Sequence, residues 1–447
     1  MSQTPHRQNS PPPARRHLPP THRLLWFVGV LWAAAAAGFV HRTYFQQGHL
    51  KDLRLSEKRW PALTQRLVVV LTDSVPFNKA FDKEYFPFLS RVRHRGTWGM
   101  QWTTEPTMTG VMLSTITTGN QPFMWNVVRN WKMQELQHET FLDGLQSAGL
   151  KMEAWGDIPW GRQVGTRMDR FYVLAEEGKD EKGRPIHWPD KLISMSKRIT
   201  EAALFAIEQD DFEFFAWHLA ITDLVMHEVF REGLMTGRVF RYVDGLFEKM
   251  VHRFDDGRTT FLFLSDHGCA ANGRHGTLDA DARRAYYLLF GNGVLASGRH
   301  DIRQEDISST LLALVGRTPN AASAGRPLVE ALALDSRGRA QRILGALENR
   351  LTYLEAKRRR HPRYSPNIKS AKVELAELQN HLAADRPAVV VERGTSLLRR
   401  LDESARAHRR SNNTPEAALW WVALGLSLLV FLLTVSLDDG RVSSHDA

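Results

Sequence analysis

Three apolar segments of the chain each end in an aspartate, and histidines follow two of them. The segments span residues 66–74, 212–223 and 259–268, and the last one closes with the letters SDHG. Carboxylate oxygens and imidazole nitrogens are the ligands that zinc and neighbouring divalent metals take in proteins. The side chains that could bind metal in this way are Asp73, Asp223, His227, Asp266, His267 and His275.

Six such ligands exceed what one open catalytic zinc needs, whereas they suit two cations about 4 Å apart. Two cations at that spacing can bind both the attacking and the leaving oxygen of a phosphoryl transfer. Each residue alone has a simpler explanation, because a strand-end aspartate often caps a helix and a single histidine is often only packed or solvated. The joint arrangement favours the metal site. His218 and Asp157 lie close to the pattern and are assigned no metal.

The segment 105–122, EPTMTGVMLSTITTGNQP, is rich in hydroxyl side chains. It has the pattern of a helix start, where Thr107 or Thr109 could accept hydrogen bonds from free backbone N–H groups. A hydroxyl at that place also feels the positive end of the helix dipole, and metal binding would make its alkoxide available. The same helix start attracts phosphate. The segment therefore offers a candidate nucleophile for phosphoryl transfer.

Strand-like apolar segments alternate with amphipathic segments such as 138–150 over residues 61–330. This alternation predicts an α/β domain with a mostly parallel central sheet and helices on both faces. Ligands of open α/β sheets bind at the carboxyl ends of the strands. We therefore expect the three aspartates to converge on one rim of the sheet.

The composition of the chain excludes only a few classes of function. The chain has 447 residues and a net charge of +10, which indicates a weak attraction to anionic lipids or phosphorylated substrates. No nucleic-acid motif is present, so we expect no nucleic-acid partner. Cys269 is the only cysteine, which excludes an intrachain disulfide.

Two apolar segments without charge flank the α/β domain in the sequence. Residues 24–40 and 417–437 are predicted to be transmembrane helices, with a cleaved signal peptide as the alternative for the first. Residues 1–23 are predicted to be a disordered basic tail, and residues 438–447 a second tail. The chain is thus predicted to be an integral membrane protein with the lipid bilayer as a partner.

Residues 335–410 are charged and amphipathic, with Pro362 and Pro366 as breaks. We interpret them as a helical stalk between the α/β domain and the second apolar segment. A solvated helical hairpin is the alternative. The basic residues before the second segment would favour a cytoplasmic domain by the positive-inside rule.

The order of these features resembles the alkaline phosphatase superfamily, in its phosphodiesterase and phosphotransferase branch. More narrowly it is similar to the catalytic domain of GPI ethanolamine phosphate transferases. The motifs FPFLSRV, ITTGNQPF, FLDGLQSAGLKMEAWGDIPW and SDHGCAANGRHG follow that family's order, over about residues 66–280. The SDHG and DxxxH elements are specific together and weak apart.

The resemblance implies an alkaline phosphatase-like fold and a two-metal enzyme with Zn²⁺, or alternatively Mn²⁺. It implies that Thr109, the second threonine of PTMT, is the nucleophile, and that Asn130 hydrogen-bonds the phosphate. It implies a phosphodiester or phospholipid donor, phosphoethanolamine as one possible group transferred, and a domain on the periplasmic or lumenal side. The implied ligands are Asp73, Thr109, Asp266 and His267 for one metal, and Asp223, His227 and His275 for the other.

The sequence also departs from the family. Met226 stands where the family has glycine before the histidine of the second site, and EVF replaces the usual Gly-Pro after it. A sulfatase on the same fold is one alternative, although PTMTG lacks the modifiable Cys or Ser context that sulfatases need. A catalytically inactive, membrane-tethered binding protein is the other alternative.

Overall fold

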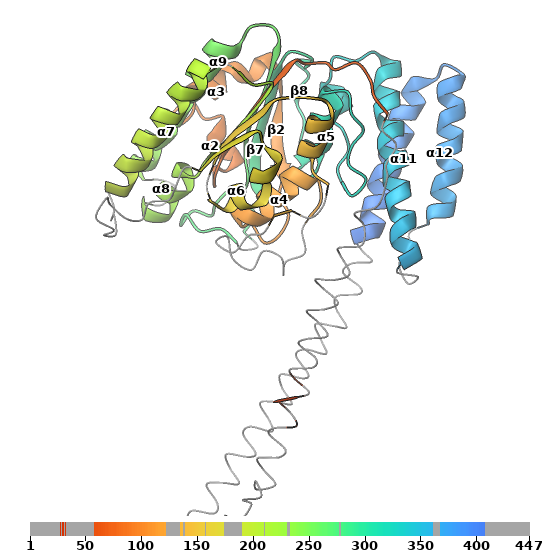
Figure 1. The fold of residues 1–447 in the computed structure, drawn as a ribbon, viewed down its shortest axis with the longest axis horizontal. Helices are drawn as coiled ribbons and strands as arrows, with labels where there is room; N and C mark the ends of the chain where they lie inside the picture. The colour runs from red at the N-terminus through yellow and green to blue at the C-terminus, as the bar shows by residue number, and fades with distance from the viewer. Residues whose placement is uncertain are drawn as a thin grey trace, which may run out of the picture. The chain divides into compact units, whose positions relative to one another are not determined.

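The computed structural model describes residues 58–121, 135–136, 139–156, 158–173, 190–209, 211–229, 233–276, 279–360 and 367–406, with positions 27, 29, 30 and 32. Apart from those four positions, the described residues belong to one compact unit, Leu50–Arg406. A mixed β-sheet with helices on both sides forms the centre of this unit (Figure 1).

Nine strands of the described chain form the sheet, in the order β4-β3-β5-β1-β6-β7-β2-β8, with β9 also paired to β2. Neighbouring strands are parallel, except that β7 runs antiparallel to both β6 and β2. The predicted α/β architecture is confirmed, and the sheet is mixed because of β7. The strands are β1 (Arg66–Thr72), β2 (Gly96–Trp102), β3 (Met152–Gly156), β4 (Arg170–Val173), β5 (Phe214–Leu219), β6 (Thr259–Ser265), β7 (Arg284–Gly291), β8 (Gly298–Arg299) and β9 (Ile302–Arg303).

The central strands β1, β5 and β6 are buried at every position, as expected of strands covered on both faces. Their side chains alternate between two apolar cores. Val68 and Val70 of β1 belong to the first core, whereas Leu67, Val69 and Leu71 belong to the second. This period of two is what a pleated strand imposes.

Each core is closed by its own set of helices. The first core is covered by α2 (Phe77–Ala80), α3 (Pro87–Val92), α7 (Asp190–Gln209), α8 (Ile221–Val229) and α9 (Leu234–Phe254). The second is covered by α4 (Thr109–Thr118), α5 (Phe141–Ser147), α6 (Ile158–Val164) and α10 (Asp306–Leu314). Short 3₁₀ turns lie at Arg93–Arg95, Gly165–Arg167 and Val329–Ala331.

Three helices follow α10: α11 (Ser336–Arg360), α12 (Ile368–Ala383) and a helix over residues 387–406. They share a third apolar core, to which Ala321 and Val329 also belong. A buried ion pair joins Arg350 of α11 to Asp402 at 2.7 Å. These helices therefore lie against the α/β domain, and their role as a stalk stays a prediction.

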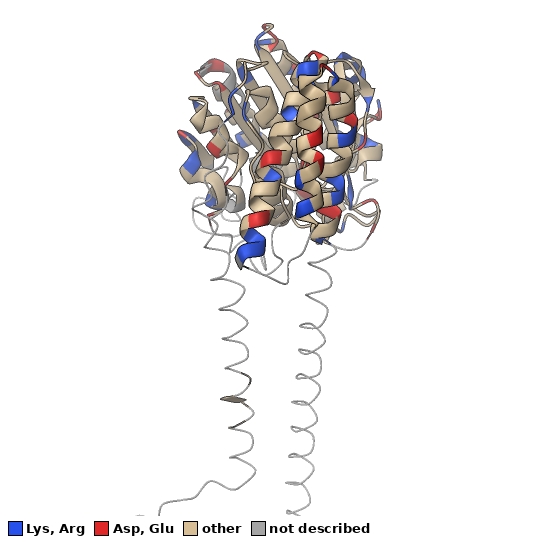
Figure 2. Ribbon diagram, turned by 90° about the vertical axis from the view of Figure 1, so that its right-hand side faces the viewer, with Lys and Arg blue, Asp and Glu red and all other residues tan. Residues whose placement is uncertain are grey.

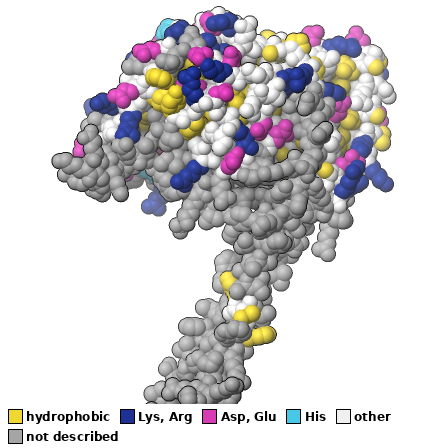
Figure 3. All heavy atoms as spheres, in the orientation of Figure 1, with side chains coloured by type: hydrophobic (Ala, Val, Ile, Leu, Met, Phe, Trp, Pro, Cys, Tyr) yellow, Lys and Arg dark blue, Asp and Glu magenta, His cyan; other side chains and the backbone are white. Residues whose placement is uncertain are grey.

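Charges on the helical segment are mixed rather than uniformly basic. Figure 2 shows basic and acidic residues interspersed along these helices, and Lys372–Glu355 and Arg400–Glu374 are two of the ion pairs. The face of the molecule in Figure 3 likewise intersperses both signs. The described charged residues are therefore not gathered into one patch of a single sign on the faces shown.

The predicted architecture needs a correction on one point, its two transmembrane helices. Within the part of the chain that the structure describes, no helix is both long and apolar enough to cross a bilayer. The prediction of an integral membrane protein is corrected on the same finding. The segments 24–40 and 417–437 lie outside the described residues, except for four positions of the first, and the tails 1–23 and 438–447 lie outside them entirely.

Candidate metal centre

The strand register brings two of the predicted ligands to one rim of the sheet. β1 is central, and its last residue, Thr72, pairs with Leu219 of β5 on one side and with Ser265 of β6 on the other. The three parallel strands thus end at the same level. Asp73 and Asp266 follow directly after β1 and β6, so both carboxylates start from this rim.

Asp223 reaches the rim differently from the prediction, which placed it at the end of a strand. β5 ends at Leu219, and Asp223 lies in the first turn of α8. Thr222 fixes this helix start, because its hydroxyl donates to the backbone oxygen of Asp73 at 2.6 Å. The helix then places His227, four residues on, on the same face as Asp223.

The first cluster of ligands is buried. His267 Nε2 lies 3.5 Å from Asp73 Oδ1 and 3.4 Å from Asp266 Oδ2, and the three side chains are at most 3% exposed. The Thr109 hydroxyl lies 3.4 Å from the other oxygen of Asp73. The structure therefore brings together the four residues that the resemblance assigned to one metal.

His218 also belongs to this cluster, and sequence reasoning had set it aside. Its Nε2 lies 3.4 Å from Asp73 Oδ2. One ligand atom each from His218, Asp73 and Asp266 lies within 4.8 Å of the others. The available signal was the alternation of β5, in which Phe214, Ala216 and His218 share one face of the sheet.

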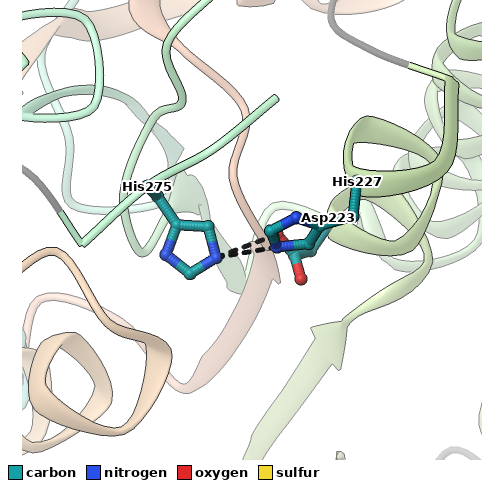
Figure 4. Close-up of side chains that lie close together, drawn as sticks. All are labelled: Asp223, His227 and His275. Atoms are coloured by element: carbon teal, nitrogen blue, oxygen red, sulfur yellow. Dashed lines mark hydrogen bonds and ion pairs between the residues drawn. The ribbon is translucent and has the colours of Figure 1, made fainter. Parts of the chain in front are cut away.

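The second cluster consists of Asp223, His227 and His275, and Figure 4 shows the two rings turned toward each other from α8 and from the loop after β6. Asp223 Oδ1 lies 3.3 Å from His227 Nε2 and 3.4 Å from His275 Nε2, and the two nitrogens are 3.0 Å apart. This cluster is more open than the first, because the His227 side chain is 44% exposed.

The loop that carries His275 is held at both of its sides. His275 Nδ1 lies 2.8 Å from the backbone oxygen of Thr107, and the backbone N–H of Gly276 donates to the Thr107 hydroxyl at 2.7 Å. Nδ1 therefore carries the hydrogen in the neutral ring, which leaves the lone pair of Nε2 available to bind a metal. On the other side, a Cβ on Gly273 would meet the backbone oxygen of Met226 at 2.0 Å, so the loop packs directly on α8.

Thr109 is the first residue of α4, and its hydroxyl does not cap the helix. The N-cap residue is Met108, which makes no side-chain capping bond. The capping explanation for Thr109 therefore fails, and its hydroxyl faces Asp73 instead. Thr107, the other candidate cap, bonds to the loop of His275.

The clustered charges shift the pKa values of the metal-free protein. Burial, together with Asp266 and Asp223, raises the pKa of Asp73 to about 6, and burial raises that of Asp266 to about 7. Burial lowers the pKa of His267 to about 4. Burial also opposes the charged forms of Asp223 and His275. The hydrogen bonds that Asp223 makes with His227 and His275 outweigh it, so the pKa of Asp223 is lowered and that of His275 is raised to about 9.

Both clusters fit divalent cations by their donor atoms. Asp266 Oδ2 and His267 Nε2 are buried, face each other, and have no hydrogen-bond partner among the described residues. Buried polar atoms of this kind are rare unless another group satisfies them. The two carboxylates and the His267 imidazole of the first cluster, and the one carboxylate and two imidazoles of the second, are donor sets that zinc and manganese accept.

We expect the metal-free protein to lose stability as the pH rises from 6.5 to 9. His275, whose folded pKa of about 9 exceeds its unfolded value of 6.5, stabilises the fold below pH 6.5 and loses that contribution up to pH 9. Buried Asp266, whose pKa is raised to about 7, also ionises within this range, and its ionisation lowers the stability of the fold further. His267 acts in the opposite direction only near pH 6.5, because its unfolded pKa of 6.5 lies at the lower limit of this range and its folded pKa is about 4. The expected loss is about 2 kcal/mol, measured by urea unfolding in the presence of a chelator.

Bound metal should remove this pH dependence, because ligands bind metal in their deprotonated forms. A His275→Gln variant in the chelator serves as control and should show a smaller loss of stability than the wild type. Stability that is constant or rises from pH 6.5 to 9 in the chelated wild type would contradict the assignment.

Two further positions of the sequence analysis cannot be placed. Asn130, the predicted phosphate-binding residue, and Asp157, which was assigned no metal, both lie outside the described residues. The roles of the seven predicted metal ligands stay predictions, although the structure brings all seven to the two clusters.

Comparison with known proteins gives one family match. The sequence model of the family described as type I phosphodiesterase / nucleotide pyrophosphatase matches residues 67–408. The search of curated proteins found no match.

Several solved structures are similar to this chain at low sequence identity. Murine ectonucleotide pyrophosphatase / phosphodiesterase 5 has a TM-score of 0.43 and 12% identity, over 57% of this chain and 96% of its own. A protein in the alkaline phosphatase superfamily from Vibrio parahaemolyticus has a TM-score of 0.43 and 16% identity, over 66% and 78%. The lipoteichoic acid synthase LtaP from Listeria monocytogenes has a TM-score of 0.42 and 13% identity, over 57% and 72%. At these scores the structures add no argument about the chemistry of this chain.

Proposed function

The chain belongs to the type I phosphodiesterase / nucleotide pyrophosphatase family, and from this premise we propose that it cleaves phosphodiesters with Thr109 as nucleophile and two divalent cations as cofactors. The family match spans most of the described chain and confirms the predicted place in the phosphodiesterase branch of the alkaline phosphatase superfamily. The narrower resemblance to GPI ethanolamine phosphate transferases stays a prediction.

The position of the Thr109 hydroxyl carries the proposal. Thr109 is the first residue of α4 and is 5% exposed. Its hydroxyl lies 3.4 Å from Asp73 Oδ2, at the edge of the first cluster. A helix N-terminus favours the negative charge of an alkoxide or of a phosphate. The ten residues of α4 are long enough to supply that field. The site thus combines an activated hydroxyl with two sets of metal donors.

The residues divide into two proposed metal sites. Divalent cations, when bound, would offset the charge that develops on the phosphoryl oxygens and lower the pKa of the nucleophile. The first cation would be held by Asp73, Asp266, His267 and Thr109. The second would be held by Asp223, His227 and His275.

The chemical steps follow from this arrangement. The Oγ of Thr109 attacks the phosphorus in line, its proton passes toward Asp73, and the bond from phosphorus to the leaving alkoxide breaks. The alkoxide takes a proton from solvent, and a phosphothreonine that still carries the second ester group remains. Water or an acceptor hydroxyl then attacks the phosphorus and gives up its proton to solvent. The bond from phosphorus to Thr109 breaks, and the Thr109 oxygen takes back the proton from Asp73. Hydrolysis and transfer share the first step, so phosphoethanolamine transfer would differ only in the acceptor.

The two alternatives are less well supported. A sulfatase needs a modifiable cysteine or serine as nucleophile, whereas Cys269 is buried with its Sγ 3.5 Å from Met226 Sδ. The proposed nucleophile at the start of α4, which faces Asp73 Oδ2, is Thr109. An inactive binding protein would have no reason to retain the full donor set beside that threonine.

The proposal is tested with the purified full-length chain. We expect about two equivalents of Zn²⁺ or Mn²⁺ per chain and cleavage of bis(p-nitrophenyl) phosphate, with much slower cleavage of p-nitrophenyl sulfate. A chelator should abolish the activity, and added metal should restore it. Acid quenching during turnover should trap a p-nitrophenyl phosphate group on the peptide that contains Thr109. A chain that binds both equivalents and cleaves no diester would overturn the proposal.

A further inference from the structure

A serine adopts a backbone conformation that favours glycine, at the point where β1 ends. Ser74 has a φ of +65°, and Asp385 is the only other non-glycine residue with positive φ in the described chain. Such a conformation brings Cβ too close to the following carbonyl oxygen. Ser74 is also completely buried, so contact with solvent does not explain why a polar side chain stands at this position.

The backbone turn at this residue directs three consecutive N–H groups to different hydrogen-bond acceptors. The N–H of Asp73 donates to the Thr222 hydroxyl at 2.9 Å, and the N–H of Ser74 donates to Asp266 Oδ1 at 3.2 Å. The next N–H, of Val75, donates to the Ser265 hydroxyl at 2.9 Å. The turn therefore spreads three donors over three partners. A glycine would make the same bonds without strain, so the backbone alone does not require a serine.

The hydroxyl of Ser74 lies between the two metal clusters. It donates to Asp223 Oδ1, and it lies 3.3 Å from Asp73 Oδ1 and 3.4 Å from His267 Nδ1. His267 Nδ1 lies closer to the backbone oxygen of Gly268, at 2.9 Å, and carries its own hydrogen there. A hydroxyl has one proton, and Asp223 is its nearest acceptor. The bond therefore goes to the oxygen of Asp223 that also faces His227 and His275.

We propose that Ser74 is a positioning residue that links the two metal sites. Its N–H holds Asp266 of the first cluster, and its hydroxyl holds Asp223 of the second. One residue thereby fixes two carboxylates on separate elements, and the strain at its φ is offset by this hydroxyl contact. The inference rests on the proposed function, because it concerns the spacing of the two proposed cations.

The hydroxyl and the strain can be separated by two substitutions. Ser74→Ala removes the hydroxyl and keeps the strained φ, whereas Ser74→Gly removes both. Both variants keep the backbone N–H and its bond to Asp266. Ser90→Ala is the matched control, because the Ser90 hydroxyl is buried in α3 with no hydrogen-bond partner among the described residues.

The readout is Zn²⁺ binding to the chelator-treated full chain, together with urea unfolding of the same samples. We expect both Ser74 variants to bind one of the two Zn²⁺ equivalents about 10- to 100-fold more weakly, and the other nearly as tightly as the wild type. The glycine variant should unfold at higher urea than the alanine variant. Ser90→Ala should bind both equivalents like the wild type.

Three outcomes would overturn the inference. Two equivalents bound with wild-type affinity by both Ser74 variants would exclude the link while leaving the proposed function intact. An equal weakening of both equivalents, with lower stability, would indicate a merely structural serine. A wild-type chain that binds no Zn²⁺ or Mn²⁺ would overturn the proposed function first, and this inference with it.

Discussion

Replacing Thr109 by alanine is expected to lower the rate of phosphodiester cleavage by at least about 10³-fold, while both metal equivalents stay bound. The reason is that the Thr109 hydroxyl, which lies 3.4 Å from Asp73 Oδ2, would form the covalent bond to phosphorus. The measurement is the steady-state rate on bis(p-nitrophenyl) phosphate, with the metal content of each sample determined in parallel.

Two variants make this result specific. Thr109→Ser keeps a hydroxyl at the same place and should retain measurable activity. Thr117→Ala removes a hydroxyl that bonds only within α4, to the backbone oxygen of Leu113 at 2.6 Å, and should leave the rate nearly unchanged. A metal-loaded Thr109→Ala variant that turns over like the wild type would show that water attacks the phosphorus directly.

Replacing Asp73 by asparagine should change activity and stability in opposite directions. Asp73 contacts Thr109, His218 and His267, so its loss should reduce the rate by about 10²- to 10³-fold and empty the first metal site. In the metal-free protein the buried charge is unfavourable, because burial raises the pKa of Asp73 to about 6. At pH 8 the metal-free variant should therefore be more stable than the wild type, by roughly 1 to 2 kcal/mol.

The control for this prediction is a carboxylate far from the rim. Asp256 precedes β6, and its bonds to Arg258 and Thr259 outweigh its burial and lower its pKa to about 2. Its ionised form stabilises the fold above pH 3.8, so Asp256→Asn should lose a little stability and keep full activity. Equal rates for wild type and Asp73→Asn, or a less stable metal-free Asp73→Asn at pH 8, would contradict the role assigned to Asp73.

Much of the site could be predicted from the sequence, because parallel strands end at a common level. Asp73 and Asp266 follow their strands directly, and the apolar runs before them identify those strands. The spacing of four between Asp223 and His227 is informative on a helix, where it places both on one face. The sequence places Asp223 at the end of a strand, because nothing in the apolar run indicates that β5 stops at Leu219.

Other parts of the site depend on facts that the sequence does not contain. His218 shares a face of β5 with Phe214 and Ala216, but the crossover that puts α4 on that face is a property of the chain's path. Position 74 has a positive φ but is a serine, whereas a glycine is the residue that normally indicates this conformation. Thr107 contacts a loop far along the chain, so only the folded structure connects it to His275.

The unequal exposure of the two clusters has a consequence for how the cations would exchange with solvent. The side chains of Asp73, Asp266 and His267 are enclosed, whereas that of His227 is open to water. A chelator would reach the open cluster first and extract its ion faster. A preparation with one equivalent per chain would then be a half-loaded, slow enzyme rather than evidence for a single-metal mechanism.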